Sequence, residues 1–286
     1  MNTIEYVNHL GERVDLCSSP YLLQDTDLFN WKFKYDIKDG VINRTHNYTK
    51  SATEFTLKMV IVPHFVNGTY KSKVDLRLES LEKLYEIVQK DIIANKNGRI
   101  EIDNKAYMEG KIVGIDKSEI LRSNTYLSFD LKFLADNPNW IYPKGYDFEK
   151  SDAASLSGLN YNYNYNYNYT KGKIGESTIL RRHFGESQFK LTVFGPCINP
   201  RITINDNLYE VFTNISAGEY MIINSQNYTI KKHSRNGFEE NLFAQKGKEK
   251  SCFAKIPGGN LQVLWNGEFS FQLELYEERS EYGYTS

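Results

Sequence analysis

Three observations in the sequence predict a mainly β protein with one helix and two domains. Apolar residues alternate with polar ones in many short segments, which is the period of strands that bury one face. One segment, at about residues 78–94, has instead the three- and four-residue spacing of a helix. The chain has 286 residues, 40% of them hydrophobic, which supplies enough apolar side chains for two cores.

The first domain is predicted to span residues 1–140. Residues 4–7 and 13–16 flank a turn and are expected to form an opening hairpin. Residues 29–35 alternate aromatic with polar side chains, and residues 55–61 show the same alternation. Both segments are therefore predicted to be half-buried strands.

The predicted helix follows these strands and carries an apolar stripe. Burying this stripe against the first domain's sheet would stabilise the domain by about 1.5 to 3 kcal/mol per side chain before entropy is counted. A further hairpin at residues 100–115 and an alternating strand at 127–133 complete the domain. The members of the stripe are Leu78, Leu81, Tyr85, Val88 and Ile92.

Residues 141–186 are predicted to be a linker or arm between the domains. They contain few aliphatic residues and a run in which tyrosine alternates with asparagine. Period-two aromatics fit an extended strand with all rings on one face, whereas asparagine-rich low complexity fits a floppy linker, and the pattern leaves both open. The tyrosines of this run are Tyr161, Tyr163, Tyr165, Tyr167 and Tyr169.

Residues 187–286 predict a second β domain, with strands and turn signals at the spacing of a β-sandwich. Its clearest stretch, residues 253–276, alternates on both sides of Asn266-Gly267 and predicts a β-hairpin. A two-residue turn would set apolar residues of one strand opposite polar residues of the other. We therefore predict a three-residue loop with Gly267 in a left-handed conformation.

Neither charge nor motifs indicate an enzyme or a cofactor. The net charge of -1 gives no general attraction to nucleic acid or to an anionic membrane. The sequence shows no phosphate-binding glycine loop, no metal-binding cysteine or histidine pattern and no nucleophile motif. The three cysteines are expected to be reduced thiols. No signal peptide or membrane-spanning run is found, so synthesis in the cytoplasm without an export signal is expected.

The three tryptophans are assigned different roles. Trp31 and Trp265 lie in alternating segments and are expected in the cores. Trp140, at the edge of the first domain, is a candidate for stacking on a sugar ring.

Short motifs spread over nearly the whole chain carry a family resemblance. The second domain contributes FGPCINP, GEY, KIPGGN and YEERS, at residues 194–200, 218–220, 255–260 and 276–280. The first contributes Leu22-Leu23, Trp31, Asn97-Gly98 and DNPNW at residues 136–140. Together these motifs resemble the distal tail proteins of siphophages, the bacteriophages with long non-contractile tails.

The resemblance implies a tail-tube-like β-domain with one helix, followed by a galectin-like β-sandwich. It implies a hexameric ring at the tip of the virion tail, joining the tail tube protein to the tail-tip hub or tail-associated lysin protein and the receptor-binding protein. DNA would meet it only in transit through the lumen. The expected ring interface is Leu22, Leu28 and Trp31, and the expected outer docking arm is Tyr161 to Tyr169.

Two other function classes remain open at this point. A carbohydrate-binding module or adhesin for host cell-wall glycans would use exposed aromatic side chains on the β-sandwich. A sugar-cleaving enzyme would need two carboxyl groups across a cleft, and the sequence shows no such pair.

Overall fold

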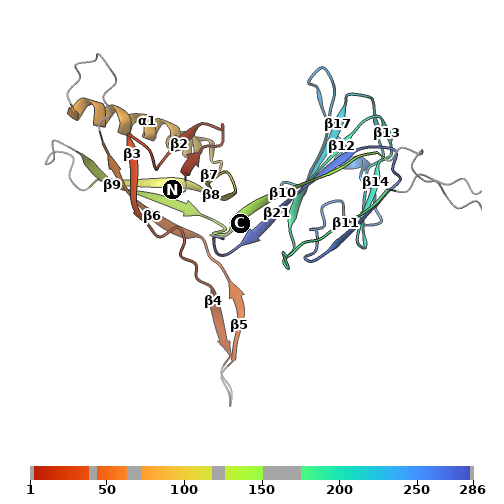
Figure 1. Cartoon of the computed structure of the whole chain (residues 1–286), viewed down its shortest axis with the longest axis horizontal. Helices are drawn as coiled ribbons and strands as arrows, with labels where there is room; N and C mark the ends of the chain where they lie inside the picture. Colours follow the sequence, from red (N-terminus) through yellow and green to blue (C-terminus); the bar gives the residue numbers. More distant parts are fainter. Residues whose placement is uncertain (1–2, 39–43, 63–72, 118–125, 151–174, 284–286) are drawn as a thin grey trace, which may run out of the picture. The chain divides into compact units, whose positions relative to one another are not determined.

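The computed structural model describes residues 3–38, 44–62, 73–117, 126–150 and 175–283. Its contacts divide the chain into two compact units, Met1–Tyr142 with Glu278–Ser286, and Pro143–Glu277. The chain passes between the units within strand β10 (Trp140–Phe148) and again within β21 (Phe271–Arg279), as Figure 1 shows. The structure confirms a mainly β fold with one α-helix in the described part of the chain.

The N-terminal unit is organised around the long strand β8, which belongs to two sets of antiparallel strands. The first half of β8 pairs with β7, which continues to β1 and β2, and the second half pairs with β9, which continues to β6 and β3. The predicted opening hairpin and the strand at residues 55–61 are both confirmed. The elements are β1 (Ile4–Val7), β2 (Arg13–Asp15), β3 (Tyr21–Thr26), β4 (Lys34–Lys38), β5 (Arg44–Thr49), β6 (Thr53–Ile61), α1 (Lys73–Ala94), β7 (Gly98–Ile102), β8 (Ala106–Lys117) and β9 (Leu127–Ala135).

Helix α1 lies on this unit, but its buried face is not the predicted stripe. Leu81 and Val88 enter the core together with Leu84, which is fully buried. The other three members of the stripe stay open: Leu78, Tyr85 and Ile92 are 44%, 51% and 46% exposed. The buried face of the helix is therefore centred toward Leu84, and only one flank of the predicted stripe meets the core.

The predicted half-buried strand at residues 29–35 is wrong. Only the start of this segment is in the core, where Phe29 packs on Trp140 with ring centroids 6.0 Å apart. From Lys34 the chain forms β4, which pairs with β5 alone, and every residue of both strands is exposed. We call this two-stranded element the arm (Figure 1).

The C-terminal unit is a β-sandwich. One sheet has the order β11-β20-β14-β15, and the facing core strands belong to the run β19-β18-β17-β12-β21. Both sheets send alternate apolar side chains into one core. The elements are β11 (Gly175–Ile179), β12 (Gln188–Phe194), β13 (Cys197–Ile198), β14 (Arg201–Ile204), β15 (Asn207–Glu210), β16 (Asn214–Ile215), β17 (Tyr220–Asn224), β18 (Thr229–His233), β19 (Glu239–Asn241), the 3-10 turn η2 (Phe243–Gln245), β20 (Leu261–Trp265) and β21.

The predicted hairpin around Asn266-Gly267 is wrong, although Gly267 does have a left-handed φ of 73°. Strand β20 pairs with β11 and β14, whereas β21 pairs with β12, so the two strands lie in different sheets. The connection therefore crosses from one sheet of the sandwich to the other. Alternation records which face of a strand is buried, and two strands can bury their faces in one core without being neighbours.

Candidate assembly surface

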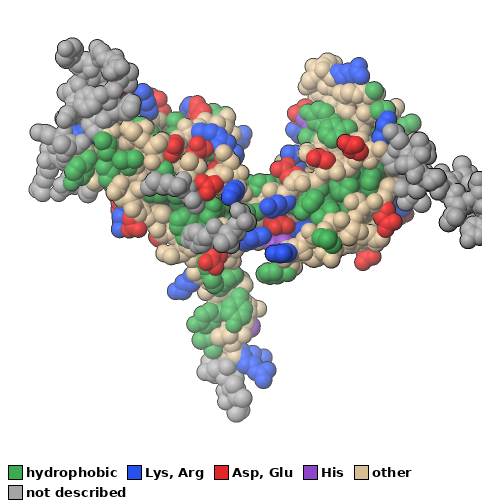
Figure 2. Space-filling model, viewed as in Figure 1, with side chains coloured by type: hydrophobic (Ala, Val, Ile, Leu, Met, Phe, Trp, Pro, Cys, Tyr) green, Lys and Arg blue, Asp and Glu red, His purple; other side chains and the backbone are tan. Residues whose placement is uncertain are grey.

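The arm carries an apolar face that the described chain does not cover. Tyr35, Ile37 and Tyr48 are 53%, 57% and 60% exposed, and the rings of Tyr35 and Tyr48 lie 6.2 Å apart. Charged side chains, Lys34, Asp36 and Lys38, occupy the alternating positions of β4. Figure 2 shows hydrophobic side chains gathered along the arm. The arm is thus an amphipathic ribbon with its apolar face in solvent.

This face continues a row of apolar side chains that begins in the core. The row starts at Phe29, then continues to Trp31, which is 51% exposed, and to Phe33, which lies 5.8 Å from the Trp31 ring. The ammonium of Lys50 lies 5.3 Å from the Phe33 ring centroid. Tyr35 and Ile37 complete it. The period-two pattern is that of a half-buried strand, so its buried side has to be supplied by something outside the described chain.

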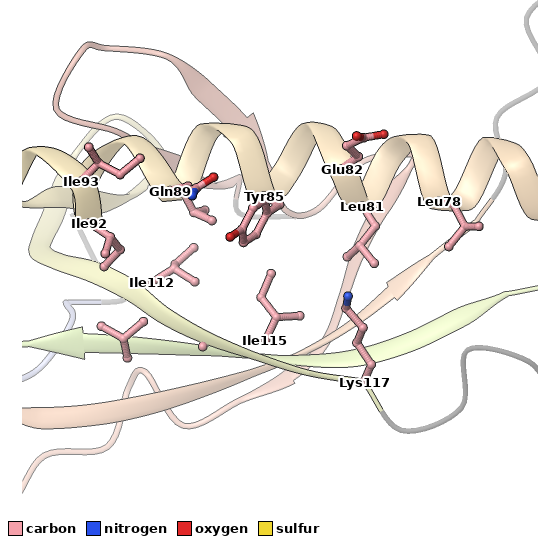
Figure 3. A pocket seen from close by; sticks show the side chains of 13 residues that line it. Leu78, Leu81, Glu82, Tyr85, Gln89, Ile92, Ile93, Ile112, Ile115 and Lys117 are labelled. Atoms are coloured by element: carbon pink, nitrogen blue, oxygen red, sulfur yellow. The ribbon is translucent and has the colours of Figure 1, made fainter.

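A second apolar surface lies between α1 and the second half of β8. Side chains of α1 point toward Ile112 and Ile115 of β8 across an open hollow of about 640 Å³ (Figure 3). A β-bulge at Ile112/Gly114 leaves Val113 43% exposed beside it. We call this surface the helix groove; its most exposed apolar members are Leu78, Tyr85, Ile92, Ile93 and Val113.

The helix groove has an apolar floor and a charged rim. Glu82 lines it from α1, and Glu86, one turn further along the helix, is also exposed. Lys117 at the end of β8 lines the opposite side. Among the described residues, the second half of β8 pairs only with β9, so its other edge carries no strand.

The sequence-predicted site residues are separated by the fold. Trp31 is exposed at the base of the arm, where it lines a small pocket with Lys50. Leu22 is half-buried in β3, and Leu28 is only 1% exposed, so Leu28 cannot reach a neighbouring copy. The tyrosines at 161, 163, 165, 167 and 169 lie outside the described residues.

Two expectations for tryptophan need correction. Trp140 is completely buried, with its ring 5.3 Å from that of Tyr282, so it offers no face to a sugar. Trp31 is not a core residue. Trp265 does pack against the second core, edge to face with Phe271 at 5.3 Å.

Buried ionisable groups occur in both units, and their contacts are structural. In the first unit Asp91 of α1 is fully buried and accepts hydrogen bonds from the Tyr6 hydroxyl and the His9 backbone N–H. Burial is the main reason that the pKa of Tyr6 lies well above its usual range. In the second unit Arg181 donates to Glu277 at 3.2 Å. These side chains join strands to neighbouring elements.

No side-chain set in the described ranges suggests a metal centre or a membrane anchor. Within those ranges, no three His, Cys, Asp or Glu side chains are grouped so that they could hold a metal ion. A search of the same residues finds no helix with the length and apolar character that crossing a membrane requires.

A comparison with solved structures finds proteins with the same fold. Over 98% of this chain and 99% of the other, the structure matches SPP1 Dit, described as a paradigm of the hub adsorption apparatus in phages infecting Gram-positive bacteria, with a TM-score of 0.61 and 11% identity. The chain has the fold of a phage distal tail protein. A chain of the phage P2 baseplate in its calcium-activated conformation matches over 99% of this chain and all of its own, with a TM-score of 0.66 and 14% identity. The strontium form of that baseplate gives a TM-score of 0.65 at 13% identity. No family model and no curated protein matches the sequence.

Sequence reasoning missed both the arm and the helix groove. The row from residue 29 to residue 37 was visible as alternation, but alternation does not say which chain covers the apolar side. The stripe on α1 was also visible, and its width, with Ile93 beside Ile92, was the available signal that one sheet would not cover it.

Proposed function

We propose that the protein is a structural component of the distal end of a siphophage tail, in which six copies form a closed ring. The fold match supports this proposal because it extends over nearly the full length of the chain and of the proteins matched. The observation that carries it is the pair of apolar surfaces, arm and helix groove, that the described residues of a single copy leave uncovered.

A contact between the arm of one copy and the helix groove of another indicates a ring. The arm and the helix groove are different surfaces, and copies join head to tail when the arm of each enters the groove of the next. Such contacts produce a ring when the rotation between copies closes. Because the formal charge of the chain is only -1, a ring lumen made from it would not hold passing DNA strongly.

In this proposal the protein acts as a mechanical adaptor at the virion tail tip. The N-terminal units form the ring on the tail tube protein, and the C-terminal sandwiches dock the tail-tip hub, the tail-associated lysin protein and the receptor-binding protein. The role requires stable contacts and no catalytic group, cofactor or metal.

Negative-stain electron microscopy of the purified full chain tests the proposal. We expect closed rings with sixfold symmetry in class averages, at a protein concentration where the ring is populated. Adding the tail tube protein encoded with this chain should give end-to-end complexes of ring and tube. Particles the size of one chain at every concentration, with and without the tube protein, would contradict the proposal.

A further inference from the structure

We propose that the apolar face of one copy's arm packs into the helix groove of a second copy. This inference rests on the proposed ring and names the surfaces that would hold it together. It joins two features of the N-terminal unit, an amphipathic ribbon and an apolar hollow, neither of which is covered by the described residues of the same chain.

The arm requires a support because it has no core of its own. An isolated two-stranded hairpin is at best marginally stable in water. In the described part of the arm, β4 and β5 pair only with each other, and Tyr35, Ile37 and Tyr48 each expose more than half of their surface. Covering these three side chains with an apolar surface would remove their exposed area from water and fix the ribbon.

The helix groove presents apolar side chains that could cover those of the arm. Leu78, Tyr85 and Ile92 recur at intervals of seven residues and form a nearly straight apolar row along α1. Ile115 of β8 faces this row across the groove (Figure 3). The open edge of β8 runs beside it, so an added extended segment would find backbone hydrogen-bonding groups as well as apolar contacts.

The charges at the two surfaces are complementary. The arm carries Lys34, Lys38 and Arg44 against a single described carboxylate, Asp36. The α1 side of the groove carries Glu82, with Glu86 exposed one turn further along the helix, and Lys117 lines the opposite side on β8. An amphipathic ribbon whose apolar face lies in the groove would bring its basic edge toward the acidic α1 side, which favours one orientation of docking.

The occupant is a second copy because the arm of the same chain points elsewhere. Within the N-terminal unit, the arm leaves the body on the side away from α1 (Figure 1). Each copy therefore has one arm to give and one groove to fill. A closed ring satisfies every arm and every groove, whereas an isolated head-to-tail dimer would leave one of each exposed.

Mixed disulfide cross-linking tests the contact directly. The full chain is prepared as Ile37→Cys, as Tyr85→Cys, and as a matched control Lys83→Cys, whose position on α1 lies away from the groove and is also exposed. Equal amounts of the Ile37→Cys and Tyr85→Cys chains are mixed, assembled and mildly oxidised, and dimers are counted on a non-reducing gel. We expect at least about tenfold more mixed dimer with Tyr85→Cys than with Lys83→Cys, because a disulfide needs Cβ atoms within about 4.5 Å. The native chain, with its three cysteines, gives the background.

The outcomes separate this inference from the proposed function. Rings that form normally but show no excess of the 37 to 85 cross-link would overturn the arm contact and leave the ring standing. A chain that stays single at all concentrations would overturn both.

A pair of substitutions at one position provides an independent test. Ile37 is 57% exposed in the single chain, so Ile37→Asp should leave the melting temperature of the monomer unchanged. It should raise the concentration needed for half-assembly by at least about tenfold, while the conservative Ile37→Leu should not, because only the charge is incompatible with an apolar groove. Unchanged assembly of Ile37→Asp would contradict the inference.

Discussion

Replacing Asp91 with asparagine should destabilise the N-terminal unit several times more than the same change at an exposed carboxylate. The carboxylate is fully buried near the C-terminal end of α1, where the helix dipole disfavours a negative charge. It is held there by the Tyr6 hydroxyl, the His9 backbone N–H at 2.8 Å and the His9 ring Nδ1 at 2.5 Å. Asp91 thereby fastens the end of the helix to β1 and the turn after it.

The size of the effect follows from these contacts. Asparagine keeps one oxygen acceptor but loses the charge, and its amide N–H groups meet groups that already donate. Losing about two hydrogen bonds to a charged acceptor, at roughly 1.5 to 3 kcal/mol each, costs about 3 to 6 kcal/mol. For a unit of this size, that corresponds to a fall of about 6 to 24 °C in its melting temperature.

Calorimetry of the full chain measures the loss of stability in Asp91→Asn. Hydrogen exchange of the peptides covering β1 and the end of α1 shows where the loss occurs. Asp116→Asn is the matched control, because it makes the same chemical change at a side chain that is 74% exposed. The control should shift stability by no more than about 0.5 kcal/mol. An Asp91→Asn variant with the control's stability would refute the role given to the buried carboxylate.

Three further predictions concern helix packing, thiol chemistry and pH. Leu84→Ala should cost about 2 to 5 kcal/mol, whereas Tyr85→Ala next to it should cost the single chain less than about 1 kcal/mol, because only Leu84 is buried; urea unfolding of both variants checks this. Burial raises the pKa of the Cys197 thiol to about 11, so its alkylation at pH 8 should be at least about tenfold slower than in urea, and equal rates would contradict this. Burial also raises the pKa of Tyr209, whose hydroxyl donates to the Ala254 carbonyl at 2.8 Å. The folded state then keeps a proton that the unfolded state loses, so this contribution is complete below about pH 10 and declines above it; Tyr209→Phe should flatten that decline in stability measured from pH 9 to 12, and an unchanged slope would contradict the assignment.

The sequence predicted the strand content and the helix because these follow from local periodicity. Strand β6 and the opening hairpin are examples, since alternate burial on one face is a property of the strand itself. Gly267 was also predicted correctly as left-handed, because that conformation depends on the residue and its turn.

The failures have a common physical cause: periodicity says that a face is buried, and it does not say what buries it. Strands β20 and β21 both alternate because they line one sandwich core, yet they lie in different sheets. The stripe on α1 was predicted to meet the sheet, and one flank of it lines an open groove instead. Residues 29–37 alternate as though half-buried, and the described chain supplies nothing for the arm to lie on.

The sequence predicted only part of the candidate assembly surface. Trp31 was chosen as an interface residue and does lie exposed at the base of the arm. Leu28 was chosen beside it and is buried, because the chain enters the core at that point. Local pattern could not separate the two, since their exposure depends on where the chain leaves the body of the unit.

The measurement that tests the central claim most directly is the mass of the full chain by light scattering over a concentration series. The account predicts a mass that reaches six copies and stops there, because a closed ring has no free arm or groove left. A mass that stays at one copy across the series would contradict it, and so would one that grows without limit, since open filaments would mean that the contact between copies does not close.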